Sequence, residues 1–453
     1  MGWGNKAKRR TAAGLATVVG VAVAAQAQNA NDGGLRADLT VSQRLTFSDN
    51  PEFVANGSSG VESLTDLSFA LASTTRTQRF RFAIGASYEA GNDDVFNPFT
   101  SLSYGRESAS TDLSFELGFR QTDVSDTVIS GDFDGDLTPE LLLAVGGQRQ
   151  DLNSRLALEF GRDAPFGATL SYEVRDRNYV DTTNPTLFDG RTNIASARFR
   201  FDVNPQVSLS LFATDTSEDE DPGGTDRDTQ RFGLGGTLAV TQSLTSSFEI
   251  SADEVTTTVG ATPTVSNDGV SYSFSLTQQV PTGSYQGSYV GRITENGRQE
   301  TLRFQRSVDL QNGNLSFSVG ATRFPTGDTR AVWGLTVGQT FERTRLNASL
   351  SQTPTVNDTN DILNTVLSLS VAHDLSPISS LESGFSWREV DTVGGIGQDS
   401  RRFDFNVTYR RDIGQDWDFS GGIRYRRQES DTATDVESNS VFFGVSKTLS
   451  WRP

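Results

Sequence analysis

The sequence has 453 residues, no cysteine, one histidine and a formal net charge of −18. The missing thiols exclude disulfides, cysteine–zinc sites, iron–sulfur clusters and thiol nucleophiles, and the acidic balance argues against nucleic acid as a partner because like charges repel. Only 35% of the residues are hydrophobic, a low fraction for a soluble protein of this length. Low apolarity with regularly spaced aromatic residues indicates either disorder or strands whose apolar residues all lie on one face.

The first residues have the features of an export signal. Basic side chains precede an alanine- and valine-rich stretch, and Ala25 and Ala27 form a small-x-small cleavage site. The apolar stretch, which ends at Ala25, is shorter than the ~20 residues of a membrane-spanning helix. We therefore expect a signal peptide over residues 1–27, a short N-terminal segment over residues 28–34, and the folded part over residues 35–453.

From Leu35 onward, segments of about ten residues alternate between apolar and polar positions. Leu113, Phe115 and Leu117, for example, interleave with polar residues. A period of two predicts β-strands, since successive side chains of a strand point to opposite faces. The pattern recurs on the order of 22 times, within a range of about 20 to 24, and its length fits membrane-crossing strands of ~9–11 residues.

The breaks between these segments alternate between short and long. Short breaks such as residues 203–206 and 412–415 contain Asn, Pro or Gly and predict tight turns. Long breaks such as residues 214–227, 255–268 and 428–438 are polar and mostly acidic. This asymmetry is typical of an outer-membrane barrel. We therefore expect an all-β fold, a single large antiparallel transmembrane β-barrel with short periplasmic turns and long acidic extracellular loops.

Residues 122–153 do not fit the up-and-down pattern. Within them, Asp132, Asp134, Asp136 and Glu140 have the spacing of carboxylates that converge on a hard cation, and the stretch resembles the calcium loop of integrin-type FG-GAP repeats. A solvated acidic loop is the alternative, because such motifs occur by chance. We expect either a special loop that folds inward and constricts the pore, with a structural calcium as the only cofactor, or one extra hairpin in the wall.

The alternation also assigns charged side chains to the lumen. Unpaired buried charges are prohibitive, so the lumen must be hydrated or laced with ion pairs. The charges either solvate the wall and pair across strands, where each pair contributes little, or form an eyelet in which arginines face carboxylates. The predicted lumen-facing residues are Arg79, Arg81, Arg198, Arg200, Arg303, Arg402, Arg410, Arg424, Arg426, Asp38, Glu116, Glu159, Asp202, Glu249, Asp404 and Asp418.

The chain resembles a bacterial outer-membrane β-barrel of the beta-barrel porin-2 families. The resemblance is carried by the export signal, the repeated Phe-x-Phe strands and the strand–turn–strand unit from Asp202 to Leu211. Such barrels usually end on an aromatic residue that the barrel-assembly machinery recognises, whereas here Trp451 is followed by Arg452 and Pro453. The resemblance implies a location in the outer membrane, contact with its lipid and lipopolysaccharide, and assembly by that machinery.

We expect a porin-like channel for the passive diffusion of small hydrophilic solutes. The alternative is a structural or surface-interaction barrel linked to exported polysaccharide. Enzymatic activity is not expected, because His373, the single histidine, falls at a predicted short turn. A TonB-dependent transporter also has about 22 strands but a plugged lumen, and a first strand near Leu35 leaves no room for a plug ahead of the barrel.

Overall fold

A computed structural model provides the fold and describes residues 34–90, 95–124, 147–182, 187–220, 224–260, 262–357, 360–393, 399–431 and 434–452. The predicted signal peptide, with its cleavage site at Ala25 and Ala27, lies outside these described residues. Within them, no helix has both the length and the apolarity needed to cross a bilayer.

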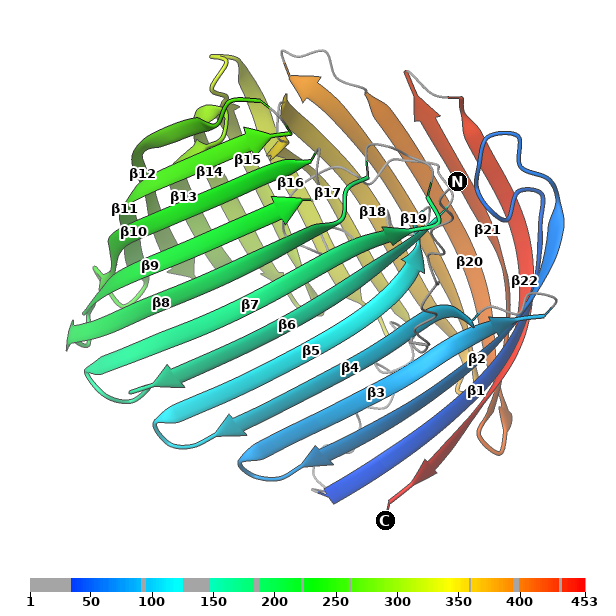
Figure 1. The fold of residues 1–453 in the computed structure, drawn as a ribbon. Helices are drawn as coiled ribbons and strands as arrows, with labels where there is room; N and C mark the ends of the chain where they lie inside the picture. Colours follow the sequence, from blue (N-terminus) through cyan, green and yellow to red (C-terminus); the bar gives the residue numbers. More distant parts are fainter. Residues whose placement is uncertain are drawn as a thin grey trace, which may run out of the picture.

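The described chain forms one closed antiparallel sheet of 22 strands. Each strand pairs with the next along the chain, and β22 pairs with β1 from Ala37↔Trp451 to Ser48↔Ser440, so the wall closes where the first and last strands meet (Figure 1). The predicted all-β barrel and its number of strands are confirmed. The strands are β1 (Gly34–Ser48), β2 (Gly60–Thr74), β3 (Gln78–Glu89), β4 (Val95–Glu107), β5 (Thr111–Asp123), β6 (Gln148–Phe160), β7 (Phe166–Val180), β8 (Gly190–Asn204), β9 (Val207–Glu220), β10 (Thr225–Ala239), β11 (Leu244–Val259), β12 (Val265–Val280), β13 (Gly283–Thr294), β14 (Gly297–Leu310), β15 (Gly313–Arg323), β16 (Thr329–Thr340), β17 (Thr344–Asn357), β18 (Asn360–Ser376), β19 (Ser379–Val393), β20 (Ser400–Gly414), β21 (Trp417–Ser430) and β22 (Val436–Trp451).

The two ends of the barrel differ in their connections. At the turn end, the end where β1 begins, every connection is as short as or shorter than residues 161–165. At the opposite loop end, connections reach residues 49–59 and 124–147. Several expected long loops are nevertheless mostly strand: of residues 214–227, only 221–224 lie between β9 and β10. The prediction of long loops here was wrong. These segments are polar, but the part of a strand that extends beyond the bilayer needs no apolar side chains on its outer face.

The outer surface of the wall is apolar and the inner surface is polar. Directly paired residues project from the same face of a sheet, so Leu39, Phe69 and Ile84 of β1–β3 share the outer surface. Large hydrophobic side chains are widely exposed there, such as Val319 at 55% and Leu302 at 59%. An apolar surface of this extent on a closed barrel fits a bilayer rather than water.

Aromatic residues mark both margins of this apolar surface. By the register of their strands, Trp333 and Trp387 lie on the outer face toward the loop end. Trp417 and Trp451 lie on the outer face at the turn end, where their strands begin and end. Two interfacial belts of Trp and Tyr are the arrangement that a bilayer favours.

The special loop predicted over residues 122–153 is shorter in the structure. β5 pairs with β6 from Thr111↔Phe160 to Asp123↔Gln148, so residues 148–153 belong to the wall. Because β5 and β6 are direct neighbours, no further described strand lies between them. The remainder of the special loop, including Asp132, Asp134, Asp136 and Glu140, lies outside the described residues.

Candidate functional site

The strand register determines which charged side chains face the lumen. Phe199 is exposed on the outer surface, and its neighbours Arg198 and Arg200 therefore lie on the inner face of β8. The same alternation, followed through the paired strands, places each of the sequence-assigned charges on the inner face. These are Arg79 and Arg81, Glu116 and Glu159, Arg198, Arg200 and Asp202, Glu249, Arg303, Asp38, Arg402, Asp404 and Arg410, and Arg424, Arg426 and Asp418.

Most of these charges lie in the turn-end half of the wall, where they form separate pairs rather than one ring. Arg198 contacts Glu249 at 2.7 Å, and both side chains are 44% exposed. Arg410 lies 3.3 Å from Glu382. Exposed pairs of this kind contribute about 0–1 kcal/mol each. Their arrangement is that of a solvated wall and not of an eyelet.

At the loop end, a buried network of ion pairs covers the inner faces of β6–β11. Each arginine contacts a carboxylate, and the Arg177–Glu220 pair is the most enclosed, at 8% and 10% exposure. The pairs nearly cancel in charge, so this part of the wall is rigid and close to neutral. They are Arg149–Asp151 at 2.7 Å, Arg175–Glu173 at 2.6 Å, Arg177–Glu220 at 2.9 Å, Arg227–Glu218 at 3.1 Å, Arg227–Glu295 at 3.3 Å and Arg231–Asp253 at 2.9 Å.

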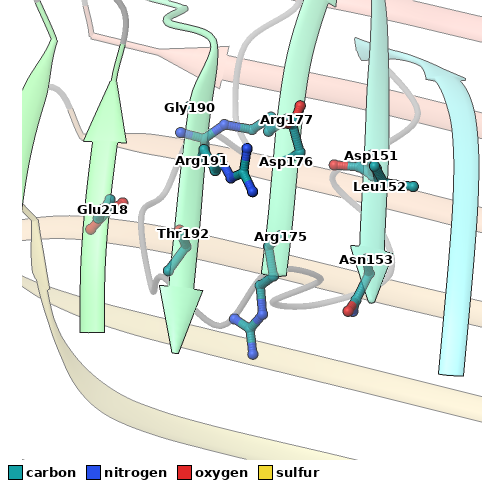
Figure 2. A pocket seen from close by; sticks show the side chains of 10 residues that line it. All are labelled: Asp151, Leu152, Asn153, Arg175, Asp176, Arg177, Gly190, Arg191, Thr192 and Glu218. Carbon is teal, nitrogen blue, oxygen red and sulfur yellow. The ribbon is translucent and has the colours of Figure 1, made fainter. Parts of the chain in front are cut away.

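A depression lies within this network and is the pocket drawn in Figure 2. Its cavity volume is about 40 Å³, and it is partly open to solvent. Figure 2 shows that four adjacent strands supply its lining, with Asp151 on β6, Arg177 on β7, Thr192 on β8 and Glu218 on β9. Two of its arginines, Arg175 and Arg177, are engaged by carboxylates, so they contribute hydrogen-bonding groups but little net charge to the depression.

The inner face of β19–β21 carries what we term the arginine cluster: Arg388, Arg402, Arg424 and Arg426. Arg388 and Arg402 are directly opposite each other in the register of β19 and β20, and Arg402 is only 3% exposed. Arg424 contacts Asp404 at 2.9 Å, and Arg426 is opposite that carboxylate in β21. The cluster brings four guanidinium groups together, and Arg424 is the member that pairs with Asp404.

An aromatic ring from the first loop packs on the arginine cluster. Phe53, in the connection 49–59, is fully buried. The guanidinium carbons of Arg402 and Arg426 lie 4.9 Å and 4.6 Å from the centre of its ring. Cation–π contacts with a desolvated ring stabilise by up to about 2 kcal/mol. Phe53 therefore holds the first loop against the wall.

Polar contacts fix the same loop to β22. The Asn50 side-chain amide donates to the Glu437 carbonyl at 3.0 Å. The Asn439 main-chain and side-chain amides donate to the Asp49 carboxylate at 2.7 Å and 2.8 Å. Burial acts to raise the pKa of Asp49, but these hydrogen bonds outweigh it and lower that pKa below its ordinary value. The loop is thus anchored across the seam where β1 meets β22.

The sequence did not predict Phe53, Arg388 or the network on β6–β11 as parts of the site. Arg388 directly follows Trp387, so the alternation of outward and inward side chains is a signal that would have placed it in the lumen. Part of the network has no sequence signal because residues 149–153 fall in the predicted special loop and residues 218–227 in a predicted long break. Nothing in the sequence indicates a role for Phe53, since a single aromatic residue in a loop forms no periodic pattern. The candidate calcium ligands lie outside the described residues, which contain no group of three metal-binding side chains.

Comparison with known proteins gives fold relatives but no family. No protein-family model and no curated protein matches the chain. Among solved structures, the ferric-catecholate import receptor Fiu from E. coli K12 is 10% identical over 92% of this chain and 82% of that one, with a TM-score of 0.59. The FrpB iron transporter from Neisseria meningitidis is 11% identical over the same fractions, with a TM-score of 0.58. A ferric enterobactin receptor from Pseudomonas aeruginosa is 10% identical over 92% and 81%, with a TM-score of 0.55.

These relatives show the fold, a large closed β-barrel. The apolar outer surface of this closed barrel places the protein in an outer membrane. The relatives also correct the sequence analysis. The prediction of a passive porin-like channel is wrong, because the structural neighbours are ferric-chelate receptors and iron transporters. The alternative of a surface barrel linked to exported polysaccharide fits these neighbours no better. Membership of the beta-barrel porin-2 families is unsupported, since no family model matches.

Proposed function

We propose that the protein is an outer-membrane uptake receptor that binds an anionic ligand at the loop end of its lumen, without chemical turnover. The class of ligand that we propose is a ferric catecholate chelate. Such a chelate is anionic because the catecholate oxygens supply more negative charge than the ferric ion offsets. The arginine cluster of this chain supports an anionic ligand, and the names of its structural neighbours suggest the class of that ligand.

The arginine cluster is the observation that carries the proposal. Arg388 and Arg402 oppose each other on adjacent strands, and like charges in directly opposite positions destabilise a sheet. Arg402 is buried under Phe53, whereas Arg388 and Arg424 are partly exposed, so an anion in the lumen can contact these two guanidinium groups. Arginine also suits this role because its planar fork matches delocalised anionic oxygens.

The structural neighbours supply the ligand class. Fiu is named as an import receptor for ferric catecholates and the Pseudomonas aeruginosa protein as a receptor for ferric enterobactin. Those names describe those proteins, and the low identity carries none of their residues over to this chain. We transfer only the chemistry, a large anionic iron chelate, because the arginine cluster has the charge to attract one.

The test is binding of ferric enterobactin to the purified, folded barrel, measured by quenching of tryptophan fluorescence. We expect saturable binding by the native protein. Arg388→Gln should weaken binding about tenfold or more, since a hydrogen bond to a charged group contributes about 1.5–3 kcal/mol. The same substitution removes one charge of the opposed pair but also the hydrogen bond that Arg388 donates to the Asn364 side chain at 3.1 Å, so the unfolding midpoint should change little.

Arg303→Gln is the matched control. Arg303 lies on the inner face of β14 between Ser288 and Gly320, so this variant loses the same charge from a different part of the lumen. We expect it to bind like the native protein. Absence of saturable binding, or equal weakening by both variants, would contradict the proposal. A neutral ferric chelate of similar size should bind weakly to all three proteins.

A further inference from the structure

The outer surface of the barrel has opposite charge character at its two ends. In the loop-end half, many outward-facing strand positions carry carboxylates, among them Asp215, Asp228 and Glu254. In the turn-end half, the outward-facing positions of the described strands carry no Asp or Glu. Carboxylates at that end face the lumen or lie in turns, as Asp416 does.

Cations are present where these carboxylates are missing. Arg106, Arg306, Arg411 and Lys447 lie on the outer face at the turn end of β4, β14, β20 and β22. Arg306 is held by its own wall: it donates to the Ser284 carbonyl at 3.1 Å and lies over a tyrosine ring. The others are placed where they can reach beyond the protein.

Two of these cations flank a tryptophan on neighbouring strands. Trp417 and Lys447 are directly paired in β21 and β22, and the Lys447 ammonium lies 5.1 Å from the centre of the indole ring. Arg411 of β20 pairs with Phe419, two residues along β21 from Trp417. Strands lie about 4.8 Å apart, so the two flexible cations on β20 and β22 can reach one bound group between them. Lys447 is also the only lysine after Lys8.

We propose that Arg411, Trp417 and Lys447, the basic–aromatic patch, bind the phosphate of an anionic phospholipid headgroup. A cation on the lipid face is costly near the middle of a bilayer and nearly neutral at the interface, so these side chains belong at headgroup depth. Tryptophan is favoured at the same depth. The positive charge of the patch, on a chain with a net charge of −18, is complementary to the negative charge of a phosphate.

This inference is independent of the proposed ligand uptake. It concerns the outer wall at the turn end, whereas the arginine cluster lies on the inner wall at the loop end. The test incubates the folded full-length protein with an equimolar mixture of phosphatidylglycerol and phosphatidylcholine and counts the lipids retained, by native mass spectrometry. Each basic residue near a membrane surface contributes about 1 kcal/mol toward anionic lipid, so retention should favour phosphatidylglycerol about fivefold per cation.

The variant Arg411→Gln with Lys447→Gln should lose most of this preference, and Lys447→Arg should keep it. Arg79→Gln with Arg81→Gln is the matched control, because it removes two charges at the same end but from the lumen. It should retain the native preference. Equal retention of both lipids by the native protein, or an equal loss in the lumen control, overturns the proposal. If the double variant does not fold, the two single variants must each lower the preference.

Discussion

Phe53 is an apolar ring in a lumen wall built almost wholly from polar side chains. Its φ of 50° is uncommon for a residue other than glycine, so the surrounding contacts must hold it there. Two guanidinium groups lie against its faces, and hydrogen bonds to Asn50 and Asp49 fix the chain before it. One residue thereby joins the first loop to strands at the far end of the sequence.

Phe53→Ala should lower the free energy of unfolding by about 3 kcal/mol, because a buried ring is lost and a cavity remains. Phe53→Leu should cost less, since it keeps much of the apolar contact and removes only the ring face that the arginines approach. Denaturant unfolding of the barrel in lipid vesicles measures both. Values within ~0.5 kcal/mol of the native protein for both variants would show that the loop is not held by this ring.

The Asp49 carboxylate makes the same anchor sensitive to pH. Its pKa in the folded protein is lowered, so its contribution to stability is present above the ordinary carboxyl pKa and is lost as the pH falls through the lowered value. The unfolding midpoint of the native protein should therefore drop in acid more than that of Asp49→Asn. At neutral pH, Asp49→Asn should be the less stable protein. Parallel pH curves for the two proteins would refute this linkage.

At the scale of the element, the strands are longer than their apolar segments. β11 spans Leu244–Val259, yet the large apolar side chains on its outer face are confined to its turn-end part, with Ile250 the last of them before Glu254. The hydrogen-bond ladder continues because neighbouring strands continue, and the inner-face ion pairs of β6–β11 sit on these extensions. At the turn end of the barrel, tight turns of defined conformation connect each strand to the next.

The turn between β6 and β7 gives a test of these connections. Gly161 has a φ of +69°, and a Cβ there would lie 2.2 Å from the Phe166 carbonyl oxygen. Gly161→Ala should destabilise the barrel by about 1–3 kcal/mol, since it forces a strained backbone. Gly118→Ala is the control, because its Cβ would meet no atom within 4 Å. Unfolding in vesicles should separate the two variants, and equal stability would contradict the assigned turn.

At the scale of the whole molecule, closure of the sheet separates an outer surface that faces lipid from an inner surface that faces the lumen. Joining β22 to β1 leaves no unpaired sheet edge, so the backbone groups of the wall are satisfied within the bilayer. Closure also gives every strand one face toward lipid and one toward the lumen. The loop end and the turn end then face opposite sides of the outer membrane, and short turns are expected on the periplasmic side.

Cysteine labelling tests this orientation, because the chain has no native cysteine. Ser58→Cys, in the exposed part of the first loop, should react with a membrane-impermeant maleimide on intact cells. Ala109→Cys, at an exposed position in the turn between β4 and β5, should react only after the outer membrane is disrupted. The reverse labelling pattern would show that the barrel has the opposite orientation in the membrane.

The sequence by itself determined the class of fold, the approximate strand number and the inner face of the charged residues that it assigned to the lumen. Alternation is a local property: Arg198 and Asp202 face the lumen because Phe199 and Phe201 face lipid. Strand ends were less predictable, since residues 148–153 and 218–220 become strand only when a neighbour extends the ladder.

Only the tertiary structure decided which charges meet. Arg388, Arg402 and Arg426 are spread over three strands, and their positions relative to one another depend on register, which one sequence does not specify. The contact of Phe53 with Arg402 and Arg426 joins the two ends of the chain, so it exists only once β1 has paired with β22. The ion pairs of β6–β11 depend on register in the same way, since Arg177 of β7 meets Glu220 of β9.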